Sequence, residues 1–226
     1  MVIRTESLQK DFIRKSRNSN VFTAVMPVSL MLEPGRLYAI KGRSGSGKST
    51  LLNMLAGILT PTAGEVFYDD IGLYGMDDGA LSRFRNERIG FIPQGKSAVM
   101  SLSVLENVNL PDILYGKRDE LRARELLDRF GIGHLADAMP SELSGGELKR
   151  MAIARAMLKS PQILFADEPT SDLDDHNTRI VFDVLREAAD SGSIVVVVTH
   201  ENDAAAISDK VYRMDAGKIV SDTQYS

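Results

Sequence analysis

The segment from Gly42 to Ser49 constrains the fold of this chain more than any other. It reads G-R-S-G-S-G-K-S and fits the pattern G-x-x-x-x-G-K-S. A strand-like run, Leu37 to Lys41, precedes it, and a helix-like run, Thr50 to Ala56, follows it. Where a strand, a glycine-rich turn and a helix follow one another in this way, backbone N–H groups of the turn and the helix N-terminus converge on phosphate oxygens. The segment therefore predicts an α/β chain that binds a nucleotide phosphate.

Two side chains in this segment have specific expected roles. Lys48 is expected to neutralise the β- and γ-phosphates and so to take part in catalysis, and the Ser49 hydroxyl is expected to contact Mg²⁺. The other predicted contacts to ATP are Gly42, Arg43, Ser44, Gly45, Ser46, Gly47 and Thr50. A flexible Gly/Ser-rich loop is the competing interpretation, and the flanking strand and helix argue against it. The pattern alone does not distinguish ATPases from GTPases or small-molecule kinases.

Apolar runs with strand character recur along the chain and alternate with helical stretches. They are Arg36 to Lys41, Glu65 to Tyr68, Ile89 to Pro93, Gln162 to Ala166 and Ser193 to Thr199. This alternation predicts a largely parallel sheet, with Ile194 to Val198 as a central strand buried on both faces. Val2 to Leu32 instead predicts antiparallel strands. We expect one domain over residues 1–226, with a helical subdomain at about 96–158 inserted in the α/β core.

Composition excludes several other classes of protein. With 43% hydrophobic residues in 226, the chain can bury a full core, and its net charge of −4 predicts no nucleic-acid surface. It has no cysteine, and its 3 histidines lack the spacing of a zinc site. The most apolar run, Ile194 to Val198, is far shorter than the roughly 20 residues of a membrane-spanning helix. We therefore expect an intracellular chain that reaches a membrane only through a partner.

A second motif, which is acidic, spans Ile163 to Glu168: it is an apolar strand that ends in two carboxylates. The strand would carry Asp167 to the carboxyl edge of the sheet, where Mg²⁺ would lie, with a water between them. Glu168 is placed to orient or deprotonate an attacking water. A solvated turn is the competing interpretation, which the phosphate-binding segment makes less favourable.

Leu143 to Glu147 reads L-S-G-G-E and resembles the signature sequence of ABC ATPases. Taken alone, Ser144 and two glycines before an apolar helix, Leu148 to Leu158, also fit an ordinary capped helix. The resemblance spans nearly the whole chain. It implies a P-loop NTPase (RecA-like) core with a mostly parallel sheet, an N-terminal antiparallel β subdomain and an inserted helical subdomain.

The resemblance also implies how the site works. Two ATP molecules would lie between two subunits, and the signature of one subunit, Ser144, Gly145, Gly146 and Glu147, would face the γ-phosphate held by the other. Gln94 matches the glutamine that contacts Mg²⁺ and senses γ-phosphate, and His200 resembles the switch histidine. A loop that crosses the dimer interface would consist of Ser171, Asp172, Leu173 and Asp174. Phe12 is the expected adenine-stacking residue, with Phe22 as the competing candidate.

Two further segments, Ser82 to Phe91 and Ser103 to Pro111, resemble one branch of the family in particular. That branch includes ATPases of lipoprotein release, macrolide efflux and antimicrobial-peptide resistance. The implied function is ATP hydrolysis that drives a separate membrane permease, at the cytoplasmic face of the cell membrane, for export or mechanical signalling. The second ATPase subunit would be an identical or a divergent copy. The alternative is a non-transport ABC ATPase that regulates cell division or DNA maintenance.

Two residues depart from the family pattern. Glu147 replaces the glutamine with which many signatures end, and this would put an extra carboxylate near the nucleotide. Pro93 stands before Gln94, where close relatives often have an aromatic residue. Some relatives share this glutamate, so it is not expected to inactivate the chain, whereas Pro93 bears on the fit to the membrane partner.

Overall fold

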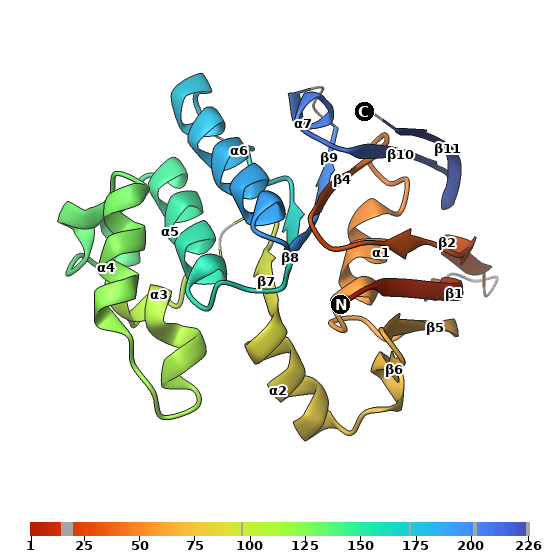
Figure 1. Ribbon diagram of the computed structural model, residues 1–226, viewed down its shortest axis with the longest axis horizontal. Coiled ribbons are helices and arrows are strands. Elements are labelled where there is room, and N and C mark those ends of the chain that lie inside the picture. Colours follow the sequence, from red (N-terminus) through yellow and green to blue (C-terminus); the bar gives the residue numbers. More distant parts are fainter. Residues whose placement is uncertain (15–19, 96, 172, 201–202, 225–226) are drawn as a thin grey trace.

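The strands of the chain form two sheets, which lie beside a group of helices (Figure 1). The computed structural model describes all residues except 15–19, 96, 172, 201–202 and 225–226. The larger sheet has 6 strands in the order β11-β10-β4-β9-β8-β7. Its strands are β4 (Arg36–Lys41), β7 (Ile89–Ile92), β8 (Ile163–Asp167), β9 (Ile194–Thr199), β10 (Lys210–Asp215) and β11 (Lys218–Gln224).

The centre of this sheet is β9, which pairs in parallel with β4 and with β8. All of its residues are buried. Val195 and Val197 pack into one hydrophobic cluster, and Val196 and Val198 pack into the other. Because successive side chains of a strand point to opposite faces, this valine run is buried on both faces of the sheet. The predicted α/β fold with a largely parallel sheet is confirmed.

The smaller sheet is antiparallel and contains the N-terminal strands. Its members are β1 (Ile3–Arg14), β2 (Asn20–Val28), β3 (Met31–Leu32), β5 (Ala63–Tyr68) and β6 (Ile71–Gly72). The expected antiparallel pairing of the N-terminal segment is therefore confirmed. The assignment of Glu65 to Tyr68 to the parallel sheet is wrong, because β5 pairs antiparallel with β1. Buried Val66 and Tyr68 pack with Ile3 in one cluster, and this shared apolar face favours the pairing.

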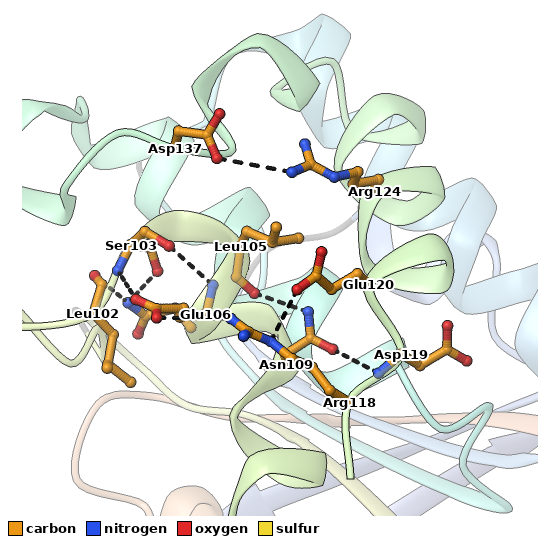
Figure 2. Close-up of polar contacts among 11 residues, drawn as sticks. Leu102, Ser103, Leu105, Glu106, Asn109, Arg118, Asp119, Glu120, Arg124 and Asp137 are labelled. Atoms are coloured by element: carbon orange, nitrogen blue, oxygen red, sulfur yellow. Dashed lines mark hydrogen bonds and ion pairs between the residues drawn. The ribbon is translucent and has the colours of Figure 1, made fainter.

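The helices between β7 and β8 are α3 (Val104–Ile113), α4 (Glu120–Arg129) and α5 (Gly145–Met157), and they lie together in Figure 1. Helix α4 is amphipathic, with Ala123, Leu126 and Leu127 buried. Figure 2 shows how α3 and α4 are joined: the Asp119 N–H donates to Asn109 Oδ1 at 3.1 Å, and Arg118 pairs with Glu106 and Glu120.

The other described helices are α1 (Lys48–Leu55), α2 (Asp78–Arg88), α6 (Asp175–Asp190) and α7 (Asp203–Ala206), with short helical turns at Leu73–Gly75, Gly133–Leu135 and Pro140–Glu142. In α1, Leu51, Leu52, Met54 and Leu55 are buried. These side chains belong to the cluster that contains Val196 and Val198 of β9. The packing fixes α1 against the sheet and so positions the glycine-rich turn at its start.

Asp209, directly before β10, forms hydrogen bonds with residues of β4 and α6. Its Oδ2 accepts from the Leu37 N–H at 2.6 Å and from Arg186 Nη1 at 2.8 Å. Partial burial acts to raise the pKa of this carboxyl, but the hydrogen bonds from Arg186 and Leu37 outweigh it and lower the pKa. A carboxyl whose pKa is lowered by folding stabilises the folded state above its unfolded pKa of about 3.9. That contribution is lost as pH falls through the folded-state pKa.

We expect Asp209→Asn to lower the free energy of unfolding by about 1–2 kcal/mol at pH 7, because the charged partner of Arg186 is lost. The difference from the parent should shrink as pH falls below about 4. Urea denaturation at pH 7 and pH 3 measures both values. Asp190→Asn is the matched control, since Asp190 also pairs with Arg186 but its side chain is 65% exposed, against 35% for Asp209. Equal losses in the two variants would contradict the prediction.

Candidate functional site

The glycine-rich turn joins β4 to α1 and lies against β2 and the β10–β11 turn. Gly47 has a φ of 100°, and a Cβ there would collide with the carbonyl oxygen of Ala24 in β2. The Gly217 N–H donates to the Ser46 carbonyl at 2.9 Å. The Ser46 side chain is buried, and its Oγ has no hydrogen-bond partner among the described residues. The turn is therefore held from both sides and keeps a buried hydroxyl available for a ligand.

Lys48 is buried within this turn, with a relative exposure of 7%. Its Nζ donates to the Gly42 carbonyl at 2.8 Å and to the Arg43 carbonyl at 3.1 Å. Both acceptors are neutral, so the positive charge of the ammonium is not balanced by these contacts. An anionic phosphate in the turn would provide a charge-assisted hydrogen bond in their place.

Asp167 ends β8 next to the turn and is 5% exposed. Burial raises the pKa of its carboxyl, and a hydrogen bond with Ser49 acts in the opposite direction. Its Oδ1 has no hydrogen-bond partner among the described residues. Unpaired buried oxygen atoms are costly, and oxygen is the ligand that Mg²⁺ prefers. No group of three or more His, Cys, Asp or Glu in the described part of the chain could hold a metal, so further ligands would be of other kinds, such as side-chain hydroxyl or amide oxygens, a nucleotide or water.

Glu168 is joined to the end of the neighbouring strand β9. Its Oε2 accepts from the Thr199 hydroxyl at 3.1 Å, and its Oε1 lies 3.0 Å from His200 Nδ1. The side chain of Glu168 is 9% exposed, whereas that of His200 is 66% exposed. Glu168 also has a φ of 48°, which is uncommon for a residue with a side chain. Such strain persists where surrounding contacts fix the backbone, and it occurs often at functional sites.

An open cleft of about 980 Å³ contains most of the residues predicted to bind ATP. Gln94 reaches it from the loop after β7, and Glu168 and His200 reach it from the ends of β8 and β9. The residues that line the cleft are Phe12, Phe22, Ala24, Arg43, Ser44, Gly45, Ser46, Gly47, Lys48, Ser49, Thr50, Gln94, Glu168, Ser171 and His200. Side chains from distant parts of the sequence thus meet at one edge of the main sheet.

Phe12 and Phe22 face each other across strands β1 and β2, where they are register partners. Each is 39% exposed, and both line the cleft. Lys10 Nζ lies 5.3 Å from the centre of the Phe12 ring. Both rings therefore offer a surface on which a flat base could stack, and the structure does not rank one above the other.

The predicted interface loop begins three residues after Glu168. The Ser171 hydroxyl donates to the Glu168 carbonyl at 2.9 Å, and Leu173 is partly exposed. Asp174 accepts from the Asn177 N–H at 2.8 Å and so begins α6. Asp172 lies outside the described residues. The described residues of the loop are thus anchored at Glu168 and at the start of α6.

The signature residues at the start of α5 are not among those that line the cleft. Ser144 and Gly145 are exposed, and Gly146 and Glu147 are partly exposed. A Cβ built on Gly145 meets no atom within 4 Å. The packing of this chain therefore gives no reason for a glycine at that position.

Two features of the site were not foreseen from the sequence. Thr199 holds Glu168 by a hydrogen bond. The sequence feature that could have indicated this contact is a threonine next to His200 at the end of the valine-rich strand. The turn at Gly217 supports the glycine-rich segment through a hydrogen bond. The sequence feature that could have indicated this turn is Asp-Ala-Gly between two runs of alternating polar and apolar residues. Each contact joins residues far apart in the sequence, so motif spacing does not reveal it.

Comparison with known proteins agrees with these motifs. The profile of the ABC transporter family matches residues 25–171. A lipoprotein-releasing system ATP-binding protein, LolD of Myxococcus xanthus, is 40% identical over 197 residues, which cover 85% of this chain and 88% of the relative. A macrolide export ATP-binding/permease protein, MacB of Campylobacter fetus, is 37% identical over 226 residues, but these are 99% of this chain and 35% of MacB. The chain therefore spans about a third of that longer relative.

Solved structures share the fold over nearly the whole chain. The ATP-binding cassette MJ0796 has a TM-score of 0.91 and 32% sequence identity, and the alignment covers 98% of each chain. It was solved as a dimer in a post-hydrolysis state bound to ADP and Pi. The neighbour thus combines a closely similar fold with the products of ATP hydrolysis.

Proposed function

The chain belongs to the ABC transporter family, and from this premise we propose that it binds and hydrolyses ATP to drive a membrane permease. The observation that carries the proposal is the cleft of about 980 Å³, which joins the Lys48 turn to Gln94, Glu168 and His200. A buried lysine for the phosphates and an anchored carboxylate for the attacking water are what hydrolysis of a phosphoanhydride requires.

Within this cleft, the glycine-rich turn binds the phosphates through its N–H groups, and Lys48 neutralises their charge. Glu168 accepts a proton from water, and its contacts with Thr199 and His200 fix the direction of its carboxylate. His200 is exposed toward the cleft, where the γ-phosphate would lie. One of the two phenylalanines, with Phe12 preferred, stacks on adenine.

Mg²⁺ fits this site on the chemistry of its donors. Asp167 offers a buried oxygen without a hydrogen-bond partner among the described residues, and Ser49 offers a hydroxyl beside it. Gln94 adds an amide oxygen on the loop after β7. We propose that these three residues hold Mg²⁺, in part through water, and the ion would neutralise charge on the phosphates.

Two copies of the chain would complete two sites. Each copy carries a cleft with Lys48 and, away from it, an exposed signature with Ser144 and Gly145. A symmetric dimer places identical surfaces on both subunits, so each signature would close the cleft of the other copy. The open space around Gly145 supports this arrangement, because an approaching phosphate needs it.

A separate permease would supply the path through the membrane. No helix in the described part of the chain is both long enough and apolar enough to span a bilayer. The similar LolD is named as the ATP-binding protein of a lipoprotein-releasing system, and MacB is named as a combined ATP-binding and permease protein. We propose that this chain acts at the inner face of the cell membrane, in export or in mechanical signalling across it.

We expect the purified chain to retain ATP in the presence of Mg²⁺, to release phosphate, and to co-purify from native membranes with a permease. Bound nucleotide, phosphate release and mass spectrometry of the isolated complex measure these results. Failure to retain ATP would contradict the ATPase assignment. Recovery of nucleic acid in place of a permease would contradict the transport assignment and favour a role in DNA maintenance.

A further inference from the structure

Helix α5 begins with a hydrogen-bonded pair, Ser144 and Glu147, in which the serine hydroxyl is already engaged. The Glu147 N–H donates to Ser144 Oγ at 3.3 Å, and the Ser144 N–H donates to Glu147 Oε2 at 2.7 Å. These two bonds form a capping box. A third contact is added, because the Ser144 hydroxyl donates to Glu147 Oε2 at 2.7 Å.

The pair at the start of α3 has the same box but not the third bond. The Ser103 N–H donates to Glu106 Oε2 at 2.9 Å, and the Glu106 N–H donates to Ser103 Oγ at 3.2 Å (Figure 2). The other oxygen of Glu106 lies 3.7 Å from Arg118. A capping box therefore does not by itself require the hydroxyl to face the carboxylate.

A serine hydroxyl has one proton to donate, and an ionised carboxylate or phosphate can only accept. The hydrogen bonds from the Ser144 hydroxyl and backbone lower the pKa of Glu147, so its carboxylate is ionised at neutral pH. The hydroxyl cannot donate to Glu147 and to a phosphate at the same time. In addition, two negative charges a few ångströms apart repel each other.

We propose that Glu147 competes with the γ-phosphate of the opposite subunit for the Ser144 hydroxyl, and so weakens the ATP-bound dimer and favours its reopening. The inference rests on the proposed function, in which the signature closes the cleft of a second copy. A glutamine at this position would avoid the conflict, because its amide can donate to Ser144 Oγ and leave the hydroxyl proton to the phosphate.

The test uses Glu168→Gln as the parent, since this variant is expected to keep ATP unhydrolysed. We expect the additional change Glu147→Gln to lower the dissociation constant of the ATP-bound dimer about tenfold, or roughly threefold for each of the two sites. Sedimentation velocity with ATP measures it. Binding of ATP to the monomer should not change, because Glu147 acts on the nucleotide of the other copy. Damage to α5 would weaken the dimer, which is the opposite direction.

Glu106→Gln is the matched control, since it makes the same chemical change in the capping box of α3. It should leave the dimer affinity unchanged. The increase in dimer affinity from Glu147→Gln should also be smaller when Ser144 is replaced by Ala, because there is then no hydroxyl proton for which Glu147 and the phosphate compete. An equal gain without the serine hydroxyl would overturn the competition.

A dimer that is no tighter with Glu147→Gln would overturn this inference and leave the proposed function standing. If Glu168→Gln alone binds no ATP or forms no dimer, the proposed function fails, and this inference fails with it. The two failures are thus seen in different samples of one experiment.

Discussion

Replacing Glu168 by Gln is expected to lower the rate of ATP hydrolysis about 10²–10⁴-fold while ATP stays bound. The glutamine amide cannot take a proton from the attacking water. It has nearly the same size as the glutamate, and its oxygen can still accept from the Thr199 hydroxyl, which is 3.1 Å from Glu168 Oε2. The fold should therefore persist, and dimers with bound ATP should accumulate. Phosphate release and sedimentation with ATP measure the two results.

Glu187→Gln is the control for this prediction. It makes the same substitution on α6, where the exposed Glu187 pairs with Arg129 away from the cleft. Its rate of hydrolysis should equal that of the parent. A Glu168→Gln protein that hydrolyses ATP at the parental rate would remove Glu168 from the mechanism.

The contact between Glu168 and His200 gives this prediction a structural basis that the motifs lacked. The sequence assigned His200 to the γ-phosphate and Glu168 to the attacking water, each by itself. In the structure, β8 and β9 are parallel neighbours, so their carboxyl ends bring the two side chains to 3.0 Å. We expect the imidazole to orient the carboxylate toward the attacking water.

The parts of the fold that depend on local sequence could be predicted. The glycine-rich turn, with β4 before it and α1 after it, is set by neighbouring residues. The central position of β9 also follows from its own composition, because five successive apolar β-branched residues need apolar neighbours on both faces.

The parts that depend on distant partners could not be predicted in the same way. The segment Glu65 to Tyr68 has a strand composition, but composition does not say which sheet a strand joins. Its partner β1 lies about sixty residues earlier in the chain. The β10–β11 hairpin was missed, although the residues of β10 alternate around the buried Tyr212 and Met214.

The same distinction applies to the site. Each motif could be located from its own residues, whereas the choice between Phe12 and Phe22 depends on register. The resemblance favoured Phe12, but β1 and β2 place the two rings opposite each other, and both line the cleft. The open space around Gly145 also depends on packing and could not be read from the motif. The effect of filling this space can be predicted from the structure.

We expect Gly145→Ala to lower the rate of ATP hydrolysis at least about tenfold without destabilising the chain, since one lost charge-assisted contact to phosphate has that size. Gly145 lies in the first turn of α5, and its φ is not positive, so alanine fits the backbone. Apart from the adjacent residues and the backbone of α5 itself, an added Cβ meets no atom within 4 Å. The free energy of unfolding should stay unchanged or rise by up to about 1 kcal/mol. Urea denaturation and phosphate release measure the two effects.

Mixing two inactive variants then tests whether the signature acts on the other subunit. Lys48→Ala disables the cleft of its own chain, and Gly145→Ala disables the signature of its own chain. A mixed dimer holds one site with both defects and one site with none. Since half of the dimers in an equal mixture are mixed, about a quarter of the parental rate should return. If the mixture is no more active than its two components, the signature does not act across a dimer, and the composite site is wrong.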